Sequence, residues 1–231
     1  MPRILAIETS GRTGSIALAE DRRVLVESQF PHGLKHAAEI IPMIDRLCRE
    51  RGWTPSSVEH LYVSAGPGSF TGLRIGITLA KTMAFATGVR IVAVPTVRVL
   101  AENAPPDAKD IVIVLDAKRD QIYTARFDRG GDGELHEREP AHLDTLPAML
   151  ERARRPVHLL GEGLPHHQKF ILPDDAGIIA TSPDIWRARA AVVATAGMAL
   201  ADRGEFADPC RLTPIYIRPP EAEEKWQKLH G

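Results

Sequence analysis

The chain contains very little cysteine. Its two cysteines, Cys48 and Cys210, lie far apart in a sequence of 231 residues, which argues against a disulfide scaffold and favours a reducing, cytoplasmic compartment. Long hydrophobic runs are missing as well. The apolar stretch from Ile4 to Ile7 ends at Glu8, and no stretch approaches the ~18 apolar residues of a membrane span. We therefore expect a protein that is not exported and has no membrane association.

An excess of charge of one sign is also lacking. The 29 Lys and Arg residues are balanced by 30 Asp and Glu residues, which gives a formal net charge of −1. No general positive field attracts nucleic acid, so any role with RNA has to be local or shared with a partner. The 44% of apolar residues is enough to bury the core of one large domain or two modest ones.

Familiar catalytic and nucleotide motifs are absent from the sequence. It has neither the GxxxxGK[ST] nor the GxGxxG spacing, and Ser64 has no GxSxG context that would make it a nucleophile. His32 and His36 have HxxxH spacing, which on one helix face suits a zinc ion. Pro31 and Gly33 argue against a continuous helix there, and no HExxH glutamate is present. We predict no metal site.

The first hundred residues predict a compact order of strands and helices. Short β-branched and apolar runs predict three strands, a helix with apolar positions at helical spacing follows, and two further strands enclose a second helix. The predicted strands are 4–8, 15–19, 24–28, 61–65 and 90–94, and the helices are 36–51 and 70–86. The order is βββαβαβ.

A Pro-rich and charged linker at 103–110 predicts a domain boundary. Beyond it the pattern partly restarts, with predicted strands at 111–115, 121–127 and 157–160, a helix near 143–154 and a long helix that begins at Ser182 and stops at Gly204. We therefore divide the chain into an N-terminal lobe, 1–103, and an abbreviated C-terminal lobe, 104–231. The latter ends in a charged tail from Arg218 with one apolar anchor, Trp226.

The second helix carries a stripe of small residues. Gly72, Gly76, Ala80 and Ala84 recur every four positions and so share one face. Glycine in a helix interior is unfavourable by about 0.5 to 1 kcal/mol relative to alanine, so the stripe predicts close approach of another backbone. The turn before this helix, which begins at Gly66, has two interpretations: an anion site at the helix N-terminus, or a tight strand-to-helix corner.

A turn rich in hydroxyls and glycines follows the first strand. Its candidates for nucleotide binding are weak ones, because the same residue types are common in ordinary hairpin turns. Acidic residues that end strands are where open α/β sheets usually place ligands. The nucleotide candidates are Glu8, Thr9, Ser10, Gly11, Thr13 and Asp116.

Five segments resemble the TsaB (YeaZ) family. They are ILAIETS from Ile4, HxxxIIPMI from His36, SAGPGSFTGLRIGITLAKTMAFATG from Ser64, LDAKRDQIY from Leu115 and PIYIRPPEAEEKW from Pro214. The GPGSFTGLRIG motif is the specific one. The resemblance implies an α/β, two-lobed actin-like fold (ASKHA, RNase H-like) with a βββαβαβ core and an abbreviated second lobe.

The resemblance also implies a function. TsaB proteins are accessory subunits for making threonylcarbamoyladenosine next to the anticodon of tRNA, so we expect a non-catalytic partner that binds and stabilises TsaD through the two helices. We further expect a TsaE-type ATPase in the same complex, and a homodimer when the chain is alone. Contact with tRNA is expected only through the complex. We expect no stoichiometric cofactor, and ATP, if it is used, belongs to the partner subunits. The expected interface residues are His36, Ile40, Met43, Gly72, Leu73, Gly76, Ile77, Ala80 and Ala84.

The chain departs from the family pattern at two positions. Glu8 stands where TsaB proteins commonly have Asp, and Asp120 stands where a Gly is usual. Both departures weaken a nucleotide site, because the first lengthens a carboxylate and the second adds a charge where a phosphate loop needs glycine. The metal-binding HxxxH that TsaD carries after its fifth strand has no counterpart in residues 94–100, which contain no histidine.

Two enzyme functions remain as alternatives. One is an ATP-dependent phosphotransferase or ATPase of the actin-like superfamily that uses Glu8, Thr9, Ser10 and Asp116. The other is a metallopeptidase, which the missing histidines disfavour.

Overall fold

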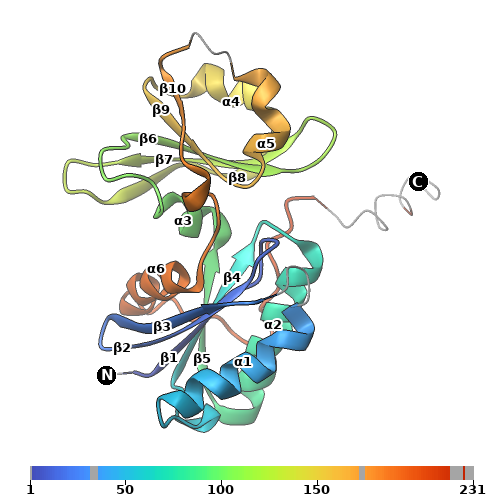
Figure 1. Ribbon diagram of the computed structural model, residues 1–231, viewed down its shortest axis with the longest axis vertical. Coiled ribbons are helices and arrows are strands. Elements are labelled where there is room, and N and C mark those ends of the chain that lie inside the picture. Colours follow the sequence, from blue (N-terminus) through green and yellow to red (C-terminus); the bar gives the residue numbers. More distant parts are fainter. Residues whose placement is uncertain (1, 32–35, 172–174, 219–225, 227–231) are drawn as a thin grey trace.

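Two five-stranded sheets form the centres of two lobes (Figure 1). The computed structural model describes residues 2–31, 36–171, 175–218 and 226. The first sheet has the order β3-β2-β1-β4-β5. Its strands are β1 (Ile4–Glu8), β2 (Ser15–Glu20), β3 (Arg23–Gln29), β4 (His60–Gly66) and β5 (Arg90–Pro95). Helices α1 (His36–Glu50) and α2 (Phe70–Thr87) cover one face, and α6 (Ala190–Asp202) covers the other.

The second sheet has the order β10-β9-β6-β7-β8. Its strands are β6 (Asp110–Asp116), β7 (Ile122–Arg129), β8 (Leu135–Asp144), β9 (Val157–Leu160) and β10 (Ile178–Ala180). Helix α4 (Leu146–Arg152) packs on its outer face, α5 (Leu164–His167) follows β9, and α3 (Thr96–Ala101) lies between the two sheets (Figure 1). The predicted two-lobed fold and the βββαβαβ core are confirmed.

Strand periodicity divides the interior into three cores. Along β1, Leu5 and Ile7 point toward α1 and α2, whereas Ile4 and Ala6 point toward α6. The core on the α6 side continues through α3 to Ile111 and other residues of the second sheet. The lobes therefore share one continuous apolar core, whereas the core beneath α1 and α2 and the outer core of the second lobe are separate from it.

Helix α6 packs on the first sheet, although the sequence division places it in the second lobe. Its contacts are close, because a β-carbon at Gly197 would lie 2.5 Å from the ring of Tyr62 on β4. The helix also begins later than Ser182. Its first amides donate to the Ser15 hydroxyl (2.8 Å) and the Glu27 carboxylate (3.0 Å) of the first lobe, so a tertiary contact, not the local capping signal, fixes its start.

The segment that follows α6, residues 205–218, returns along the first lobe and ends at the second; we call it the C-terminal segment. Ala207 donates its amide to Ile91 of β5 (2.8 Å), and Ile215 donates to Ala65 of β4 (2.7 Å). Arg218 then donates to the carbonyl oxygen of Ala117, in the turn after β6, at 2.9 Å. The segment thus covers the β5 edge of the sheet and ties the two lobes together.

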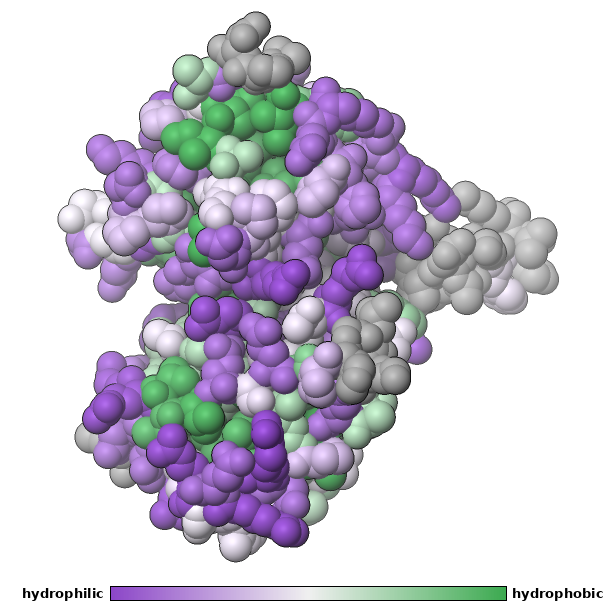
Figure 2. Space-filling model, in the orientation of Figure 1, coloured by the Kyte–Doolittle hydropathy of each residue, from purple (hydrophilic) through white to green (hydrophobic). Residues whose placement is uncertain are grey.

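Hydrophilic atoms line most of the waist between the lobes, where the surface is hollowed (Figure 2). Within the described ranges, no helix combines the length and the apolar character that crossing a membrane requires.

Candidate functional site

The turn after β1 holds its acidic residue inward. Glu8 is fully buried, and its carboxylate accepts the backbone N–H and the hydroxyl of Ser10, each at 2.5 Å, on one oxygen. The other oxygen accepts the hydroxyl of Ser64 on β4. Both oxygens of Glu8 are therefore engaged by the chain itself, and the carboxylate braces the turn against β4.

Burial raises the pKa of the Glu8 carboxyl above its ordinary value of 4.5. The Ser10 and Ser64 donors act in the opposite direction without cancelling the effect, and the nearby Glu162 carboxylate adds to the rise. The folded chain therefore prefers the protonated form of Glu8 more strongly than the unfolded chain does.

A pH series should reveal this coupling. Because the folded pKa lies above the unfolded one, the stabilisation is complete below about pH 4.5 and is lost as the pH rises through the folded pKa. Glu8→Gln removes the titration, so we expect its free energy of unfolding to decline less between pH 4.5 and 7.5 than that of the parent. Urea unfolding at half-unit pH steps measures this, and parallel curves for the two proteins would contradict it.

The small stripe of α2 faces this same turn. A β-carbon at Gly72 would overlap the carbonyl oxygen of Thr9, and one at Gly76 would lie 2.6 Å from the Thr9 hydroxyl. Leu73, Ile77 and Ala80 are buried in the first lobe as well. The prediction of close backbone approach is correct, but the neighbour is the chain's own β1 turn. These positions are therefore internal in the isolated chain, because the repeat shows which residues share a face and not what that face contacts.

The predicted interface residues of α1 are also internal. His36, Ile40 and Met43 are buried, and the His36 ring nitrogen Nε2 lies 3.1 Å from the carbonyl oxygen of Gly11. This contact connects the start of α1 to the β1–β2 turn. Of the predicted interface set, only Ala84 is partly exposed. The other member of the HxxxH pair, His32, lies outside the described residues.

The nucleotide candidates divide into three groups. Thr9 and Ser10 are buried with Glu8, whereas Gly11 and Thr13 reach the space between the lobes. Asp116, at the end of β6, faces the buried His167 with Oδ1 3.2 Å from Nε2. The structure thus does not gather the six residues around one ligand position.

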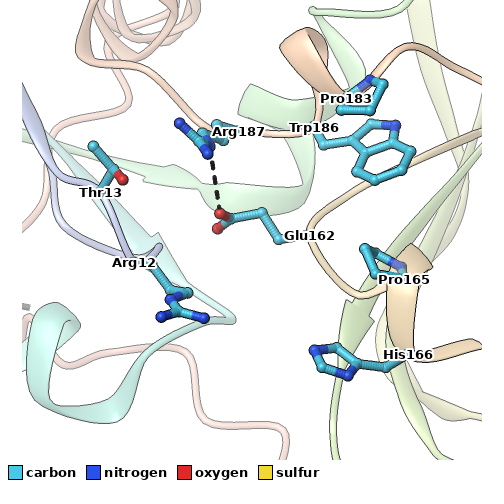
Figure 3. A pocket seen from close by; sticks show the side chains of 8 residues that line it. All are labelled: Arg12, Thr13, Glu162, Pro165, His166, Pro183, Trp186 and Arg187. Atoms are coloured by element: carbon cyan, nitrogen blue, oxygen red, sulfur yellow. Dashed lines mark ion pairs between the residues drawn. The ribbon is translucent and has the colours of Figure 1, made fainter. Parts of the chain in front are cut away.

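A cavity of about 600 Å³ opens between the lobes (Figure 3). Arg12 and Thr13 come from the β1–β2 turn, and the facing wall comes from the loop after β9, from α5 and from the segment before α6. Arg187 forms an ion pair with Glu162 (3.7 Å), and the Trp186 ring is fixed by its N–H, which donates to Thr181 (3.0 Å). The lining residues are Arg12, Thr13, Glu162, Pro165, His166, Pro183, Trp186 and Arg187.

The volume of this cavity lies within the range of small-molecule sites, and its two arginines suit an anion better than a metal ion. Sequence reasoning missed Glu162, Trp186 and Arg187, because they stand in loops without a motif. Within the described ranges, no group of three or more His, Cys, Asp or Glu residues is placed to hold a metal ion.

The turn between β6 and β7 differs from a phosphate-binding loop. Lys118, Arg119 and Asp120 have φ values of 60°, 56° and 57°, a left-handed conformation that is unfavourable by roughly 1–2 kcal/mol per residue for residues other than glycine. Glycine would adopt this conformation without that cost. Asp120 instead pairs with Lys169 (2.7 Å), so its carboxylate occupies the space beside the turn.

Helix α3 occupies the stretch where a metal-binding HxxxH would stand. Thr96 and Leu100 are buried, and they line a cavity of only about 20 Å³ together with Ser10 and Gly11. Apolar side chains here join the core shared by the lobes, so this stretch serves packing.

The exposed side of the helix pair is apolar at several positions. Ile41 on α1 and Phe85 on α2 are 54% and 68% exposed, and Ile75 and Leu79 are half-buried. Lys81 binds the C-terminal segment on another side of α2 through the carbonyl oxygen of Leu212 (3.2 Å). We name this surface the outer face: Ala37, Ile41, Ile75, Thr78, Leu79, Thr82 and Phe85.

Comparison with known proteins confirms the resemblance. Residues 33–152 match the family model described as TsaD, tRNA N6-adenosine threonylcarbamoyltransferase. The tRNA threonylcarbamoyladenosine biosynthesis protein TsaB of Bacillus subtilis is 33% identical over 96% of this chain and 97% of its own length. The protein of the same name from Escherichia coli is 26% identical over 99% of both chains. The solved structure of YeaZ from Pseudomonas aeruginosa has a TM-score of 0.77 at 25% identity, over 94% of this chain and all of that one.

Proposed function

Because this chain belongs to the TsaB family and takes part in threonylcarbamoyladenosine biosynthesis for tRNA, we propose that it is the non-catalytic subunit that binds and stabilises a TsaD-type transferase. The observation that carries the proposal is the outer face. Phe85 and Ile41 stand out into solvent on two helices that lie side by side on the sheet (Figure 1). Exposed apolar groups of this size mark protein contacts when they cluster.

The match to the TsaD model supports the choice of partner. Its range, residues 33–152, contains both α1 and α2, so a TsaD-type protein has a related helix pair. Two such pairs can pack face to face, which would bury Phe85 and Ile41 in the contact. The same face supports a homodimer when the partner is absent, because a self-complementary patch closes about a two-fold axis.

The geometry of the β1 turn supports the non-catalytic part of the proposal. Glu8 is occupied by Ser10 and Ser64, and Asp120 stands at the turn that would cradle phosphate. We accordingly propose that ATP is used by partner subunits, a TsaE-type ATPase among them, and that tRNA is reached within the assembled complex.

Co-expression with the TsaD-type subunit of the same organism tests the function. We expect a stoichiometric complex on size-exclusion chromatography and a higher thermal midpoint for the TsaD-type subunit in the complex than alone, since a partner that binds only the native state stabilises it. Two separate peaks at micromolar concentrations would contradict the proposal.

The cavity between the lobes is the one observation that favours the alternative, an ATPase. The full chain should show no ATP turnover above that of a Glu8→Ala control. Turnover that disappears in Glu8→Ala or Asp116→Ala would support the ATPase instead.

A further inference from the structure

A basic and aromatic surface lies where the C-terminal segment meets the turn between β6 and β7. The guanidinium of Arg218 donates to the carbonyl oxygen of Ala117 (2.9 Å) and to the side-chain oxygen of Gln121. These bonds hold the turn of the second lobe beside the end of a segment that runs along the first. We name the combined surface the waist patch: Phe70, Arg74, Lys118, Arg119, Tyr216 and Arg218.

The aromatic part of the waist patch is preassembled. The Tyr216 ring lies 5.0 Å from the Phe70 ring, centroid to centroid, at an interplanar angle of 33°. The Arg74 guanidinium lies 3.8 Å from the Phe70 centroid, and its Nε donates to the Tyr216 hydroxyl at 3.1 Å. Tyr216 is still 39% exposed. A further ring that stacks on it would therefore meet a side chain whose rotamer is already fixed, which lowers the entropic cost of binding.

The basic part is held outward by the turn. Ala117 donates to Gln121 (2.9 Å), Gln121 donates back to Lys118 (3.0 Å), and the Lys118 amide donates to the Asp116 carboxylate (3.2 Å). Lys118 and Arg119 are both exposed at the tip of this turn. The hydrogen-bonded turn therefore carries two cationic residues at its tip.

Positive charge exceeds negative charge on this surface. The two carboxylates of the turn have partners of their own, since Asp116 faces His167 and Asp120 pairs with Lys169. The local excess contrasts with the formal net charge of −1 of the whole chain. Residues 219–231, which follow this surface in the sequence, contain three Glu and two Lys. Every variant proposed below retains these residues, so their charge is the same in all comparisons.

Exposed rings flanked by cations are the combination that binds single-stranded nucleic acid, because bases stack on the rings and phosphates meet the cations. We infer that the waist patch contacts an unpaired stretch of the tRNA while the chain is bound to its TsaD-type partner. The inference rests on the proposed function, from which it takes the substrate class. An acidic protein segment would use the cations but would gain little from the Tyr216 ring, so RNA is the better match.

The test measures binding of a fluorescently labelled, unmodified tRNA transcript by anisotropy at several salt concentrations. It uses the full chain alone and the full chain in complex with the TsaD-type subunit. Tyr216→Ala should weaken tRNA binding roughly 5- to 150-fold, whereas Tyr216→Phe, which keeps the ring and loses only the bond from Arg74, should retain most of the affinity. Lys118→Ala should lower the slope of log affinity against log salt by about 1, and Lys118→Arg should restore it. Arg23→Ala, at the opposite edge of the first sheet, is the matched control.

Binding to the TsaD-type subunit is measured separately for each variant, so a failure of the proposed function is recognised as such. Wild-type tRNA affinity and salt slope in the Tyr216 and Lys118 variants, alone and in complex, would overturn the inference. Loss of TsaD binding with unchanged tRNA binding would also overturn it, because the patch would then be a protein contact.

Discussion

Replacing Phe85 by Asp is expected to weaken association with the TsaD-type subunit by roughly 30- to 1000-fold and to leave the chain folded. The ring is 68% exposed, so the isolated chain loses little burial. In the proposed complex the same position is buried in the contact, where an aspartate would lose its hydration without gaining a partner. Ile41→Asp, at a position that is 54% exposed, should act in the same direction. Titration calorimetry measures the association, and circular dichroism reports the fold.

Val24→Asp provides the matched control. Val24 is 37% exposed on β3, which is the edge strand at the opposite side of the sheet from β5. The Val24→Asp substitution therefore adds the same charge at another exposed apolar position. It should change neither fold nor association. Sedimentation of the isolated variants tests the homodimer, which should weaken with Phe85→Asp. If Phe85→Asp and Ile41→Asp both bind as the parent does, the contact with TsaD lies on another surface.

The sequence predicted the first lobe well, because its elements carry strong local signals. The β-branched runs of β1 and β4 and the apolar repeat of α1 place each of the seven elements of the βββαβαβ core within one residue of its observed bounds. The second lobe has weaker signals. Strand β8 (LHEREPAHLD) is mostly polar and half-exposed, so nothing in its composition distinguishes it from a loop. Helix α3 was also not predicted, because its six residues are too few to show a helical period.

The site was harder to predict, because its properties depend on which way side chains face. Glu8 ends β1 as expected, but its carboxylate turns toward Ser64, which stands 56 residues later in the chain. Trp186 and Glu162 meet Arg12 across the cavity from three separate loops, and no sequence spacing connects them. A pattern of residue types can thus locate a turn, whereas the direction of its side chains follows from contacts that are distant in sequence.

Gly72→Ala is expected to destabilise the chain itself and not only its complexes. Alanine normally stabilises a helix by about 1 kcal/mol relative to glycine, so propensity alone predicts a gain. The new methyl group, however, would overlap the carbonyl oxygen of Thr9, which belongs to the backbone of the turn braced by Glu8. Overpacking of this kind typically costs about 1–3 kcal/mol and sometimes more, so we expect a net loss of stability.

The neighbouring glycine provides an internal comparison for this prediction. At Gly76 the closest atom to an added β-carbon is the Thr9 hydroxyl oxygen at 2.6 Å, the movable end of a side chain, so Gly76→Ala should cost less than Gly72→Ala. Thr78→Ala, on the exposed side of the same helix, should be neutral or slightly stabilising. Urea unfolding ranks the three variants, and a loss of 1 kcal/mol lowers the thermal midpoint of a chain of this size by about 2–4 °C. If Gly72→Ala unfolds like the parent but no longer binds the TsaD-type subunit, the small stripe faces the partner after all.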